Sequence, residues 1–285
     1  MSVIVPFRGD PAQLEEQLRS LLSQSTTRDY EVIVADNSPP GSGVTERVQA
    51  LVAGYDRVVR VDASDRVGAA YARNVGAANA RGYLLAFVDA DDVVGSGWLE
   101  AMAAALENHA VVASRFEYTA LNPHAAQQGR KAQTEGLIPY RRPAFLPHAG
   151  GCGLGVRSDV FESVGGFNEA YRVLEDTDFA WRVQLSGHEI WFEPDAVVHI
   201  RLRPTLRGSF RQSFRYGEAH AQLQRDYQRF GMPPLGPTAT VLSVFSLLRS
   251  FPRLFSRSER AKYVRNLANR LGRWVGSVRF RVWAG

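Results

Sequence analysis

The stretch ARNVGAANARGYLLAFVDADD, residues 72–92, combines the features that decide the fold. Its alanine-rich beginning belongs to a helix that we predict over residues 68–80. The apolar run of residues 83–88 then predicts a buried strand, and three acids crowd the segment from Asp89 to Asp92. A helix, an apolar strand and polar residues at the carboxyl end of that strand form the repeating unit of a parallel α/β sheet, whose ligands bind beyond that end.

The same alternation extends to both sides of this stretch. Apolar strands are predicted at residues 3–5, 32–35, 58–61, 83–88 and 111–112. Asp10 is expected to cap a helix that begins at Pro11 and has an apolar face of leucines, and a further helix is expected over residues 98–108. The order βαβαβαβαβ predicts an α/β fold in which helices flank a mostly parallel sheet.

The pattern is less regular in the second half of the chain. Residues 121–147 are polar and rich in turn formers, which predicts a long loop or excursion. Ser158 is expected to cap a short helix, and a second helix is expected over residues 175–186, ended by Gly187. An apolar strand over residues 191–198 follows.

A proline-marked break at residues 232–234 is the expected domain boundary. It predicts one domain over residues 1–231 and a C-terminal helical segment over residues 232–285. The net charge of the chain is +5, yet residues 236–285 hold ten Lys or Arg side chains against one acid, Glu259. The basic charge therefore belongs to the C-terminal segment and not to the main domain.

The C-terminal segment combines its arginines with interleaved aromatic and aliphatic residues. Its apolar run of eleven, residues 238–248, is shorter than the ~18 to 20 residues that a membrane-spanning helix needs. Amphipathic helices on an anionic membrane surface are one interpretation of residues 236–285, and a packed helical cap with a solvated basic face is the other. The sequence contains no recognisable nucleic-acid-binding module, so nucleic acid is not an expected partner.

Composition sets further limits. The 285 residues are 45% hydrophobic and 22% charged, which excludes a disordered, collagen-like or disulfide-scaffold protein. Cys152 is the single cysteine, so an intramolecular disulfide and a multi-cysteine zinc site are both excluded. The N-terminal apolar run breaks at Pro6 and has no basic region before it, and we therefore expect a cytoplasmic protein.

Carboxylates follow three of the predicted strands, at Asp36, Asp62 and Asp89. A lone aspartate at such a place usually caps a helix or forms a turn. The cluster from Asp89 to Asp92 is different, because like charges this close repel one another unless a cation or hydrogen-bond donors hold them. Mg²⁺ or Mn²⁺ suits carboxylate oxygen together with substrate phosphate, which favours a nucleoside diphosphate as ligand; a solvated turn is the alternative.

Two further elements carry candidate catalytic groups. Glu175 and Asp176 open a predicted helix, where acids are favoured by the helix dipole without any function. Asp176 beside a second carboxylate is also a candidate general base, because burial and a like charge raise the pKa of an acid. His199 ends the next strand as a metal ligand or as a structural histidine.

Taken together, five ordered motifs over residues 2–231 resemble the family 2 glycosyltransferases, inverting enzymes of the GT-A fold that use nucleotide-diphosphate sugars. The motifs are VIVPFRGD, EVIVADNS, ARNVGAANARGYLLAFVDADD, VGGFNEAYRVLEDTDFAWRVQLSGH and PDAVVHIRLR. The third contains the family's Asp-x-Asp element and the fourth its Glu-Asp catalytic pair. The resemblance implies a GT-A domain, and the basic, amphipathic, helical extension predicted from residues 232–285 follows it.

Site residues follow from the resemblance position by position. It implies a nucleotide-sugar site made of Pro6, Arg8, Asp36, Asp62, Arg73, Asn74, Asp89 and Ala90. It implies Asp91 and His199 as ligands of Mg²⁺ or Mn²⁺, Asp176 as catalytic base, and Glu175 as the residue that orients the base or the acceptor. The residues expected to contact the acceptor or the diphosphate are Gly151, Cys152, Gln212 and Arg215.

Two departures from the family pattern leave the donor open. Arg8 stands where many relatives have asparagine, and residues 150–155, GGCGLG, replace the usual Gly-x-Asn-x-Ala-like stretch beneath the sugar. The implied reaction is an inverting transfer from a UDP-, GDP- or dTDP-linked sugar to a hydroxyl of a glycan or lipid-linked acceptor. Its expected setting is cell-envelope glycan, polysaccharide or glycolipid synthesis, at the inner face of the membrane if the C-terminal segment docks there.

Two other functions stay open from the sequence. A catalytically silent subunit that binds nucleotide sugars and scaffolds an assembly would keep the same fold. A sugar-phosphate nucleotidyltransferase also uses a parallel sheet with metal-binding aspartates, but it would want a glycine-rich basic loop after the first strand, and residues 6–10, PFRGD, supply little of that.

Overall fold

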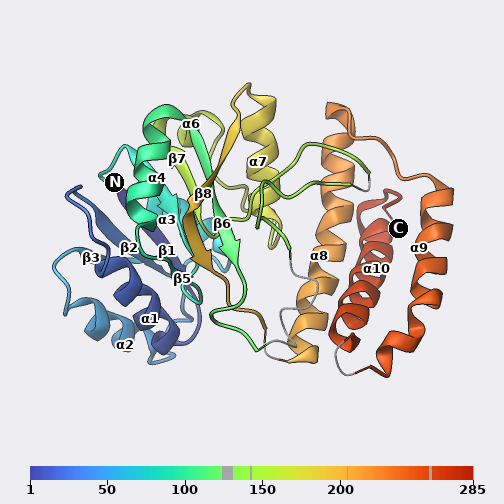
Figure 1. Cartoon of the computed structure of the whole chain (residues 1–285), viewed down its shortest axis with the longest axis horizontal. Coiled ribbons are helices and arrows are strands. Elements are labelled where there is room, and N and C mark those ends of the chain that lie inside the picture. The colour runs from blue at the N-terminus through green and yellow to red at the C-terminus, as the bar shows by residue number, and fades with distance from the viewer. Residues whose placement is uncertain (124–130, 142, 204, 257–258, 285) are drawn as a thin grey trace. The chain divides into compact units, whose positions relative to one another are not determined.

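The computed structural model describes residues 1–285 except 124–130, 142, 204, 257–258 and 285, and for residues 237–240, 243 and 244 it describes the backbone alone (Figure 1). By contacts the chain divides into two units. The first unit comprises Met1–Ala120, Ala132–Ile138 and Pro147–Arg201, and the second comprises Leu121–Lys131, Pro139–Leu146 and Leu202–Gly285. This division differs from the boundary expected at residues 232–234, because residues 202–231 group with the C-terminal helices.

One sheet forms the centre of the first unit. Its strands are β1 (Ser2–Phe7), β2 (Glu31–Asp36), β3 (Val58–Asp62), β4 (Leu84–Phe87), β5 (Val93–Val94), β6 (Val111–Glu117), β7 (Leu154–Arg157) and β8 (Ile190–His199). They are arranged in the order β3-β2-β1-β4-β7-β6-β8-β5. Strands β1 to β4 pair in parallel, as the sequence predicts, whereas β7 and β5 pair antiparallel with their neighbours and make the sheet mixed.

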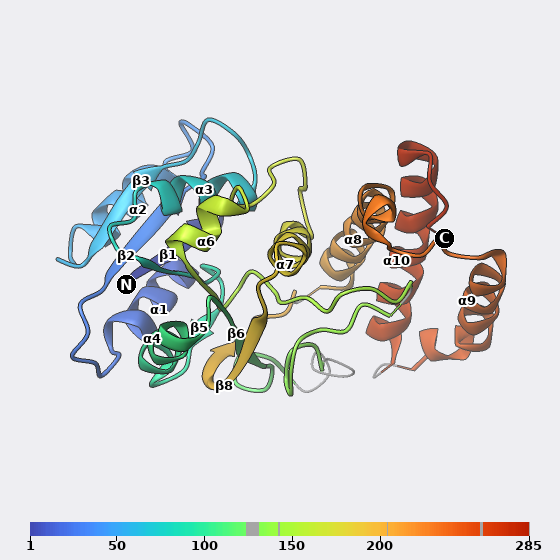
Figure 2. The same cartoon turned by 90° about the horizontal axis from the view of Figure 1, so that it is seen from above.

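Helices cover both faces of this sheet. They are α1 (Pro11–Leu22), α2 (Val44–Val52), α3 (Ala69–Ala78), α4 (Trp98–Asn108), α6 (Ser158–Ser163) and α7 (Glu175–Leu185). Figure 2 shows α1 and α4 on one face and α3, α6 and α7 on the other. This layered arrangement confirms the predicted α/β class.

The two predicted helix caps have different outcomes. Asp10 caps α1 as expected, because its carboxylate accepts a hydrogen bond from the Ala12 N–H at 3.0 Å. The prediction that Ser158 caps the short helix is wrong, because Ser158 is the first residue of α6 and Arg157 occupies the capping position without a side-chain hydrogen bond. Strand β7 runs up to Arg157 in extended conformation, so the helix begins one residue earlier than a serine cap would allow.

An aromatic cluster fixes α6 and α7 against the sheet. Phe87 on β4 lies 5.5 Å from Phe161 on α6 and 5.1 Å from Phe167, measured between ring centroids. Phe167 in turn lies 4.8 Å from Phe179 on α7. All four rings are buried, and packed aromatic side chains contribute strongly to core stability. The start of α7 is thereby held at a fixed place beside the end of β4.

The second unit is helical. Its elements are α8 (Leu206–Tyr227), the short 3₁₀ helices η1 (Gln228–Phe230) and η2 (Phe251–Leu254), α9 (Pro237–Arg249) and α10 (Arg260–Phe280). Helices α8 and α10 pack so closely that a Cβ atom on Gly217 or Gly272 would collide with the backbone of the other helix. The predicted C-terminal helices are therefore present, and within the residues that the structure describes none of the helices is long and apolar enough to cross a membrane.

Candidate active site

Residues 89–92, called here the acid turn, join the end of β4 to the start of β5. The Asp92 N–H donates to the Asp89 carbonyl at 3.3 Å and closes the turn. Gln17, fully buried on α1, holds both ends, because its amide donates to the Asp89 carbonyl at 3.0 Å and accepts from the Val94 N–H at 3.2 Å. Gln17 was not among the expected site residues, although a polar residue within the apolar face of a predicted helix is a signal that could have identified it.

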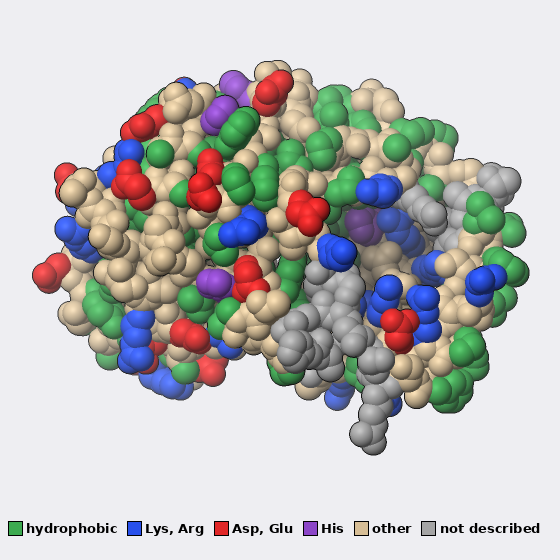
Figure 3. All heavy atoms as spheres, viewed as in Figure 1, with side chains coloured by type: hydrophobic (Ala, Val, Ile, Leu, Met, Phe, Trp, Pro, Cys, Tyr) green, Lys and Arg blue, Asp and Glu red, His purple; other side chains and the backbone are tan. Residues whose placement is uncertain are grey.

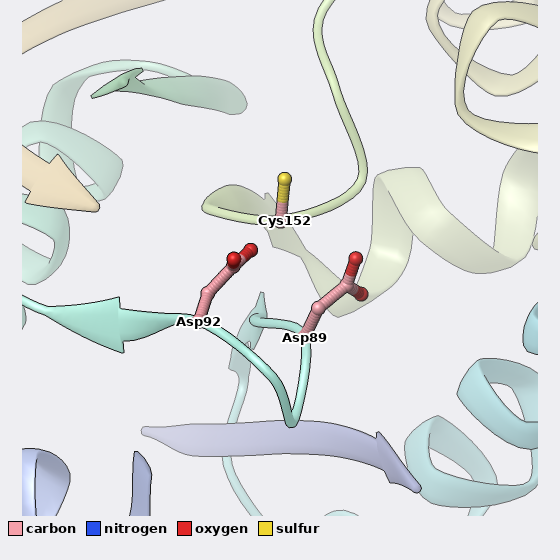
Figure 4. Close-up of side chains that lie close together, drawn as sticks. All are labelled: Asp89, Asp92 and Cys152. Carbon is pink, nitrogen blue, oxygen red and sulfur yellow. The ribbon is translucent and has the colours of Figure 1, made fainter. Parts of the chain in front are cut away.

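Three side chains at the acid turn could hold a metal ion. One ligand atom from each of Asp89, Asp92 and Cys152 lies within 4.8 Å of the other two. In the described part of the chain, this is the one group of three or more His, Cys, Asp or Glu side chains close enough together to hold a metal ion. Figure 4 shows the two carboxylates rising from the two ends of the turn on the side where the segment with Cys152 passes. Two carboxylates that converge in this way are the donor set that a hard divalent cation requires.

The electrostatics of this group favour a cation. Burial raises the pKa of Asp92 well above its usual range, and the charges of Asp89 and Asp91 raise it further. Burial, together with the charges of Asp89, Asp92 and Asp176, raises the pKa of the Cys152 thiol, which therefore stays protonated. The Arg201 backbone N–H donates a hydrogen bond to Asp92 at 2.7 Å, which lowers the pKa of Asp92 but does not cancel the rise. The carboxylates thus fit Mg²⁺ or Mn²⁺, whereas a neutral thiol does not.

The expected metal ligands Asp91 and His199 are not members of that group of three. The topology still brings His199 to the acid turn, because Val93, which directly follows the turn, pairs with His199 across β5 and β8. His199 Nδ1 lies 2.7 Å from a carboxylate oxygen of Glu117 at the end of β6. In metal sites a carboxylate on one ring nitrogen of a histidine often orients the other nitrogen toward the metal, so Glu117, which was not among the expected site residues, is a candidate for such a positioning role.

Glu117 is ionised over the whole physiological range. Burial by itself would raise the pKa of Glu117, but hydrogen bonds from Thr119, His199 and Ala120 lower it to about 2. Its register partner on β8 is His199. A prediction that the ends of β6 and β8 pair with each other would therefore have identified Glu117 as the neighbour of His199.

Arg73 lies between the two acid clusters and is nearly fully buried on α3. Its guanidinium donates to Asp89 Oδ1 at 2.7 Å and to Glu175 Oε1 at 2.6 Å. Burial alone would lower the pKa of Arg73, but Asp89, Glu175 and Asp176 raise it, so the group stays cationic. The sequence assigned Arg73 to the nucleotide, whereas the structure shows it bridging the acid turn and the start of α7.

Asp176 and Glu175 occupy the first turn of α7. Asp176 Oδ2 accepts a hydrogen bond from the Gly151 N–H at 3.0 Å, and Oδ1 accepts one from the Thr177 N–H at 2.7 Å. Burial is the main cause that raises the pKa values of both Asp176 and Glu175. Leu174, the residue before them, has a left-handed backbone with φ of 61°, a strained conformation for leucine that sequence patterns do not reveal.

Residues 150–155 connect the two acid clusters. Gly151 donates to Asp176, while the next residue, Cys152, lies beside Asp89 and Asp92. A Cβ atom on Gly151 would come within 3.0 Å of the Arg73 guanidinium carbon, so no other residue fits without displacing that side chain. This close approach is a physical reason for the glycine-rich departure from the family pattern.

Gly151→Ala is therefore expected to lower the free energy of unfolding by about 1–3 kcal/mol through overpacking against Arg73. Urea denaturation followed by circular dichroism measures this loss. Gly9→Ala is the matched control, because a Cβ atom there meets nothing within 4 Å, and its effect is expected to stay within about 0.5 kcal/mol. Equal stability of the two variants would contradict the packing described here.

The residues expected at the nucleotide lie along the carboxyl edge of β1, β2 and β3. Asp36 is the register partner of both Phe7 and Asp62. Asp36 is buried, and its carboxylate pairs with Arg60 Nε at 2.8 Å. Asp62 is exposed, and the hydrogen bonds that it accepts from Ser64 lower its pKa, which burial by itself would raise.

Two asparagines near this edge hold loops in place. Asn74 Nδ2 donates to the Phe167 carbonyl at 2.8 Å and Asn74 Oδ1 accepts from the Phe167 N–H at 2.9 Å, so both ends of its amide are engaged by the Phe167 backbone. Asn37 donates to the Arg66 carbonyl at 2.6 Å and accepts from the Gly68 N–H at 3.1 Å. Arg8 donates to the Asn37 carbonyl at 2.6 Å. Asn37 thus links the strand ends and was not among the expected residues.

The remaining expected residues are divided between the two units. Pro6 lies in β1 and Ala90 in the acid turn, both at the carboxyl edge of the first unit. Gln212 and Arg215 lie on α8 in the second unit, where the Gln212 amide donates to the Tyr216 hydroxyl at 3.4 Å.

Comparisons with known proteins identify the family of the chain. The family model described as Glycosyl transferase family 2 matches residues 2–165. The pre-mycofactocin glycosyltransferase of Mycobacterium tuberculosis is 28% identical over 236 residues, which cover 78% of this chain and 47% of the relative. Glycosyltransferase AglE of Haloferax volcanii is 26% identical over 230 residues, which cover 78% of this chain and 73% of the relative. The chain thus spans about half the length of the mycobacterial relative.

Solved structures share the fold. The mannosyltransferase PcManGT from Pyrobaculum calidifontis, in complex with GDP-Man and Mn²⁺, superposes with a TM-score of 0.62 at 18% identity, covering 97% of this chain and 72% of that one. The S. aureus TarS 1–349 structure in complex with UDP gives a TM-score of 0.54 at 16% identity, covering 98% of this chain and 90% of that one. The likeness confirms the GT-A architecture that the motifs implied.

Proposed function

Because the chain belongs to glycosyltransferase family 2, we propose that it transfers a sugar from a nucleoside-diphosphate donor to an acceptor hydroxyl with inversion at the anomeric carbon. The observation that carries the proposal is the convergence of two acid clusters on one glycine-rich segment. Gly151 binds Asp176, and the adjacent Cys152 lies at the carboxylates of Asp89 and Asp92. The proposal is supported by this proximity, because a direct displacement requires the proposed base and the proposed cation-binding turn to lie close together.

Asp176 is the proposed catalytic base. Its raised pKa makes the carboxylate a stronger proton acceptor than an exposed aspartate, because burial disfavours the charged form. Backbone N–H groups of Gly151 and Thr177 each occupy one of its oxygens and fix its orientation. Each carboxylate oxygen has a second lone pair, with which Asp176 can accept the acceptor's hydroxyl proton.

The proposed cofactor is Mg²⁺ or Mn²⁺, held by carboxylates of the acid turn with His199 beside them. Such an ion, when bound, stabilises the negative charge that develops on a departing diphosphate. Support comes from the converging Asp89 and Asp92 carboxylates and from the raised pKa of Asp92. Glu117 holds the His199 ring through Nδ1, which leaves Nε2 for a ligand.

The proposed donor is a UDP-, GDP- or dTDP-linked sugar whose nucleoside lies along the carboxyl edge of β1 to β3. Asp62 is the better placed carboxylate for a ribose or base, because it is exposed while Asp36 is committed to Arg60. Arg8 also lies on this edge and is exposed. The proposed acceptor is a glycan or lipid-linked hydroxyl, and the apolar and basic surface of the second unit, described below, supports it.

Arg73 is the proposed positioning residue of the site. Arg73→Lys is expected to lower kcat by about 10²-fold, because one ammonium group cannot hold Asp89 and Glu175 in the fork geometry of a guanidinium. Arg73→Gln also removes the positive charge, so the pKa of Asp176 is expected to rise and the acidic limb of the pH–rate profile to move to higher pH. An unchanged profile in Arg73→Gln would contradict this role.

The proposed function is tested by incubating the protein and Mn²⁺ with each donor and measuring release of the free nucleoside diphosphate, with water or simple glycosides as acceptors. Release from one donor class is expected, and NMR of the first-formed sugar product is expected to show the anomer opposite to the donor's. Product with the donor's own configuration would contradict the inverting mechanism. Binding of a donor without turnover under all conditions would favour a silent nucleotide-sugar-binding subunit.

A further inference from the structure

Exposed apolar side chains gather in the C-terminal helices. Of the seventeen large apolar side chains that are exposed among the described residues, ten lie within residues 241–283. Scattered exposed apolar residues are ordinary, but a contiguous set marks a surface that binds something.

Helix α9 carries the clearest part of this set. Val241, Phe245 and Leu248 follow one another at helical spacing and form one stripe, and Leu242 lies next to it. Their exposed fractions are between 61% and 67%, so the stripe faces solvent along its length. Helix α10 differs, because its Tyr263 and small residues are buried against the other helices of the unit. The stripe on α9 is therefore an apolar surface without a partner among the described residues.

Positive charge accompanies the stripe. Residues 236–285 contain ten Lys or Arg side chains and one acid, Glu259, and Glu259 is engaged by Arg253 at 2.9 Å. Arg249 ends α9 beside the stripe. On the face shown in Figure 3, Lys and Arg side chains gather over the region formed by α8, α9 and α10. Long arginine side chains beside apolar residues can reach lipid phosphates while their stems stay in contact with the apolar layer.

A second apolar feature lies at the end of α10. Trp274, Val278 and Trp283 are exposed, and together with Arg281 they line an open cavity of about 560 Å³. Tryptophan is enriched where one side of a surface meets hydrocarbon and the other meets water. This cavity therefore has the composition of a surface at a lipid headgroup layer.

We propose that α9 docks on the surface of an anionic lipid bilayer, with Val241, Phe245 and Leu248 inserted below the headgroups and the surrounding arginines bound to lipid phosphates. A second copy of the chain is a poorer occupant, because pairing two C-terminal segments would bring two strongly positive surfaces together. Nucleic acid would satisfy the charge but not the apolar stripe. The inference rests on the second unit alone and stands independently of the proposed sugar transfer.

The experiment is co-sedimentation of the full chain with vesicles of phosphatidylcholine alone and with vesicles of phosphatidylcholine mixed with phosphatidylglycerol. Binding to the mixed vesicles and little binding to the neutral ones is expected, and added salt is expected to weaken it. Phe245→Glu is expected to lower the partition coefficient by ~10-fold or more, since it replaces inserted apolar surface by a charge. Phe245 is exposed, so the melting temperature of the variant is expected to stay close to that of the parent chain.

Val67→Glu is the matched control, because Val67 is equally exposed but lies in the first unit. It is expected to bind vesicles as the parent chain does. Equal binding of Phe245→Glu and Val67→Glu would overturn the inference, and so would equal binding of the parent chain to neutral and anionic vesicles. A dimer that Phe245→Glu dissociates, in a chain that binds no vesicles, would assign the stripe to a second copy instead.

Discussion

Asp176→Asn is expected to lower kcat by about 10²- to 10⁴-fold or more, because it removes the group that takes the acceptor's proton. Asparagine has nearly the same shape, and its single carbonyl oxygen can still accept one of the two backbone hydrogen bonds, from the Gly151 N–H or from the Thr177 N–H. Donor affinity is therefore expected to change little. Initial rates measure the effect on kcat, and calorimetric titration with the donor measures the effect on affinity. Asp195 is an exposed aspartate on β8, so Asp195→Asn is the matched control and is expected to leave kcat and donor affinity unchanged.

The same variant has a second, independent consequence for stability. Burial raises the pKa of Asp176 in the folded protein above its value in the unfolded chain. The ionised form therefore costs folding free energy, and this cost grows as the pH rises through the folded-state pKa. Asparagine does not ionise, so the melting temperature of Asp176→Asn relative to the parent chain is expected to increase from acid to neutral pH, whatever the loss of one backbone hydrogen bond costs at all pH values. A variant with parental activity, or one whose relative melting temperature does not increase from acid to neutral pH, would contradict the assignment of Asp176.

Asp91→Ala is expected to lower the affinity for a nucleoside diphosphate in the presence of Mn²⁺ by about 10²-fold, while the affinity measured with a chelator present stays unchanged. The reason is that a cation held at the acid turn binds the diphosphate, so its loss removes the metal-dependent part of binding alone. Isothermal titration with and without Mn²⁺ measures both affinities.

Asp62→Ala is the comparison variant for Asp91→Ala. Asp62 lies on the nucleoside side of the carboxyl edge, away from the acid turn along the strand order, so its removal is expected to weaken binding equally with and without the metal. If Asp91→Ala kept the full response to Mn²⁺, the cation would be held by Asp89 and Asp92 without Asp91. The metal assignment made from the sequence would then be wrong.

The regular part of the fold could be predicted from the sequence because it depends on local patterns. Strands β1 to β4 are apolar runs that end in polar residues, α1 begins at Pro11 as predicted, and α4 has its predicted bounds. Strand β5 was missed because its two residues are too few to form a pattern, and β7 was missed because it begins within the glycine-rich residues 150–155, which do not resemble a strand. Their pairing depends on β8, β4 and β6, which are distant in the sequence.

The candidate site could be predicted in its residue types but not in its pairings. The acid clusters were evident from spacing, whereas the role of Arg73 depends on Glu175, which is 102 residues away. The left-handed Leu174 leaves no mark in the sequence, because leucine carries no signal for positive φ. The packing of the C-terminal helices could not be read from the sequence either: α10 packs closely on α8, whereas the apolar stripe of α9 is exposed, and its docking on a membrane is a proposal.

Thermal unfolding of the full chain is a direct test for a metal-dependent site that binds a nucleoside-diphosphate sugar. UDP, GDP, dTDP and their common sugar conjugates would each be added with and without Mn²⁺, because a ligand that binds the folded state raises the melting temperature. We predict a rise for one nucleotide class that requires Mn²⁺ and is lost in Asp91→Ala. No rise with any nucleotide, or the same rise without metal, would contradict the account.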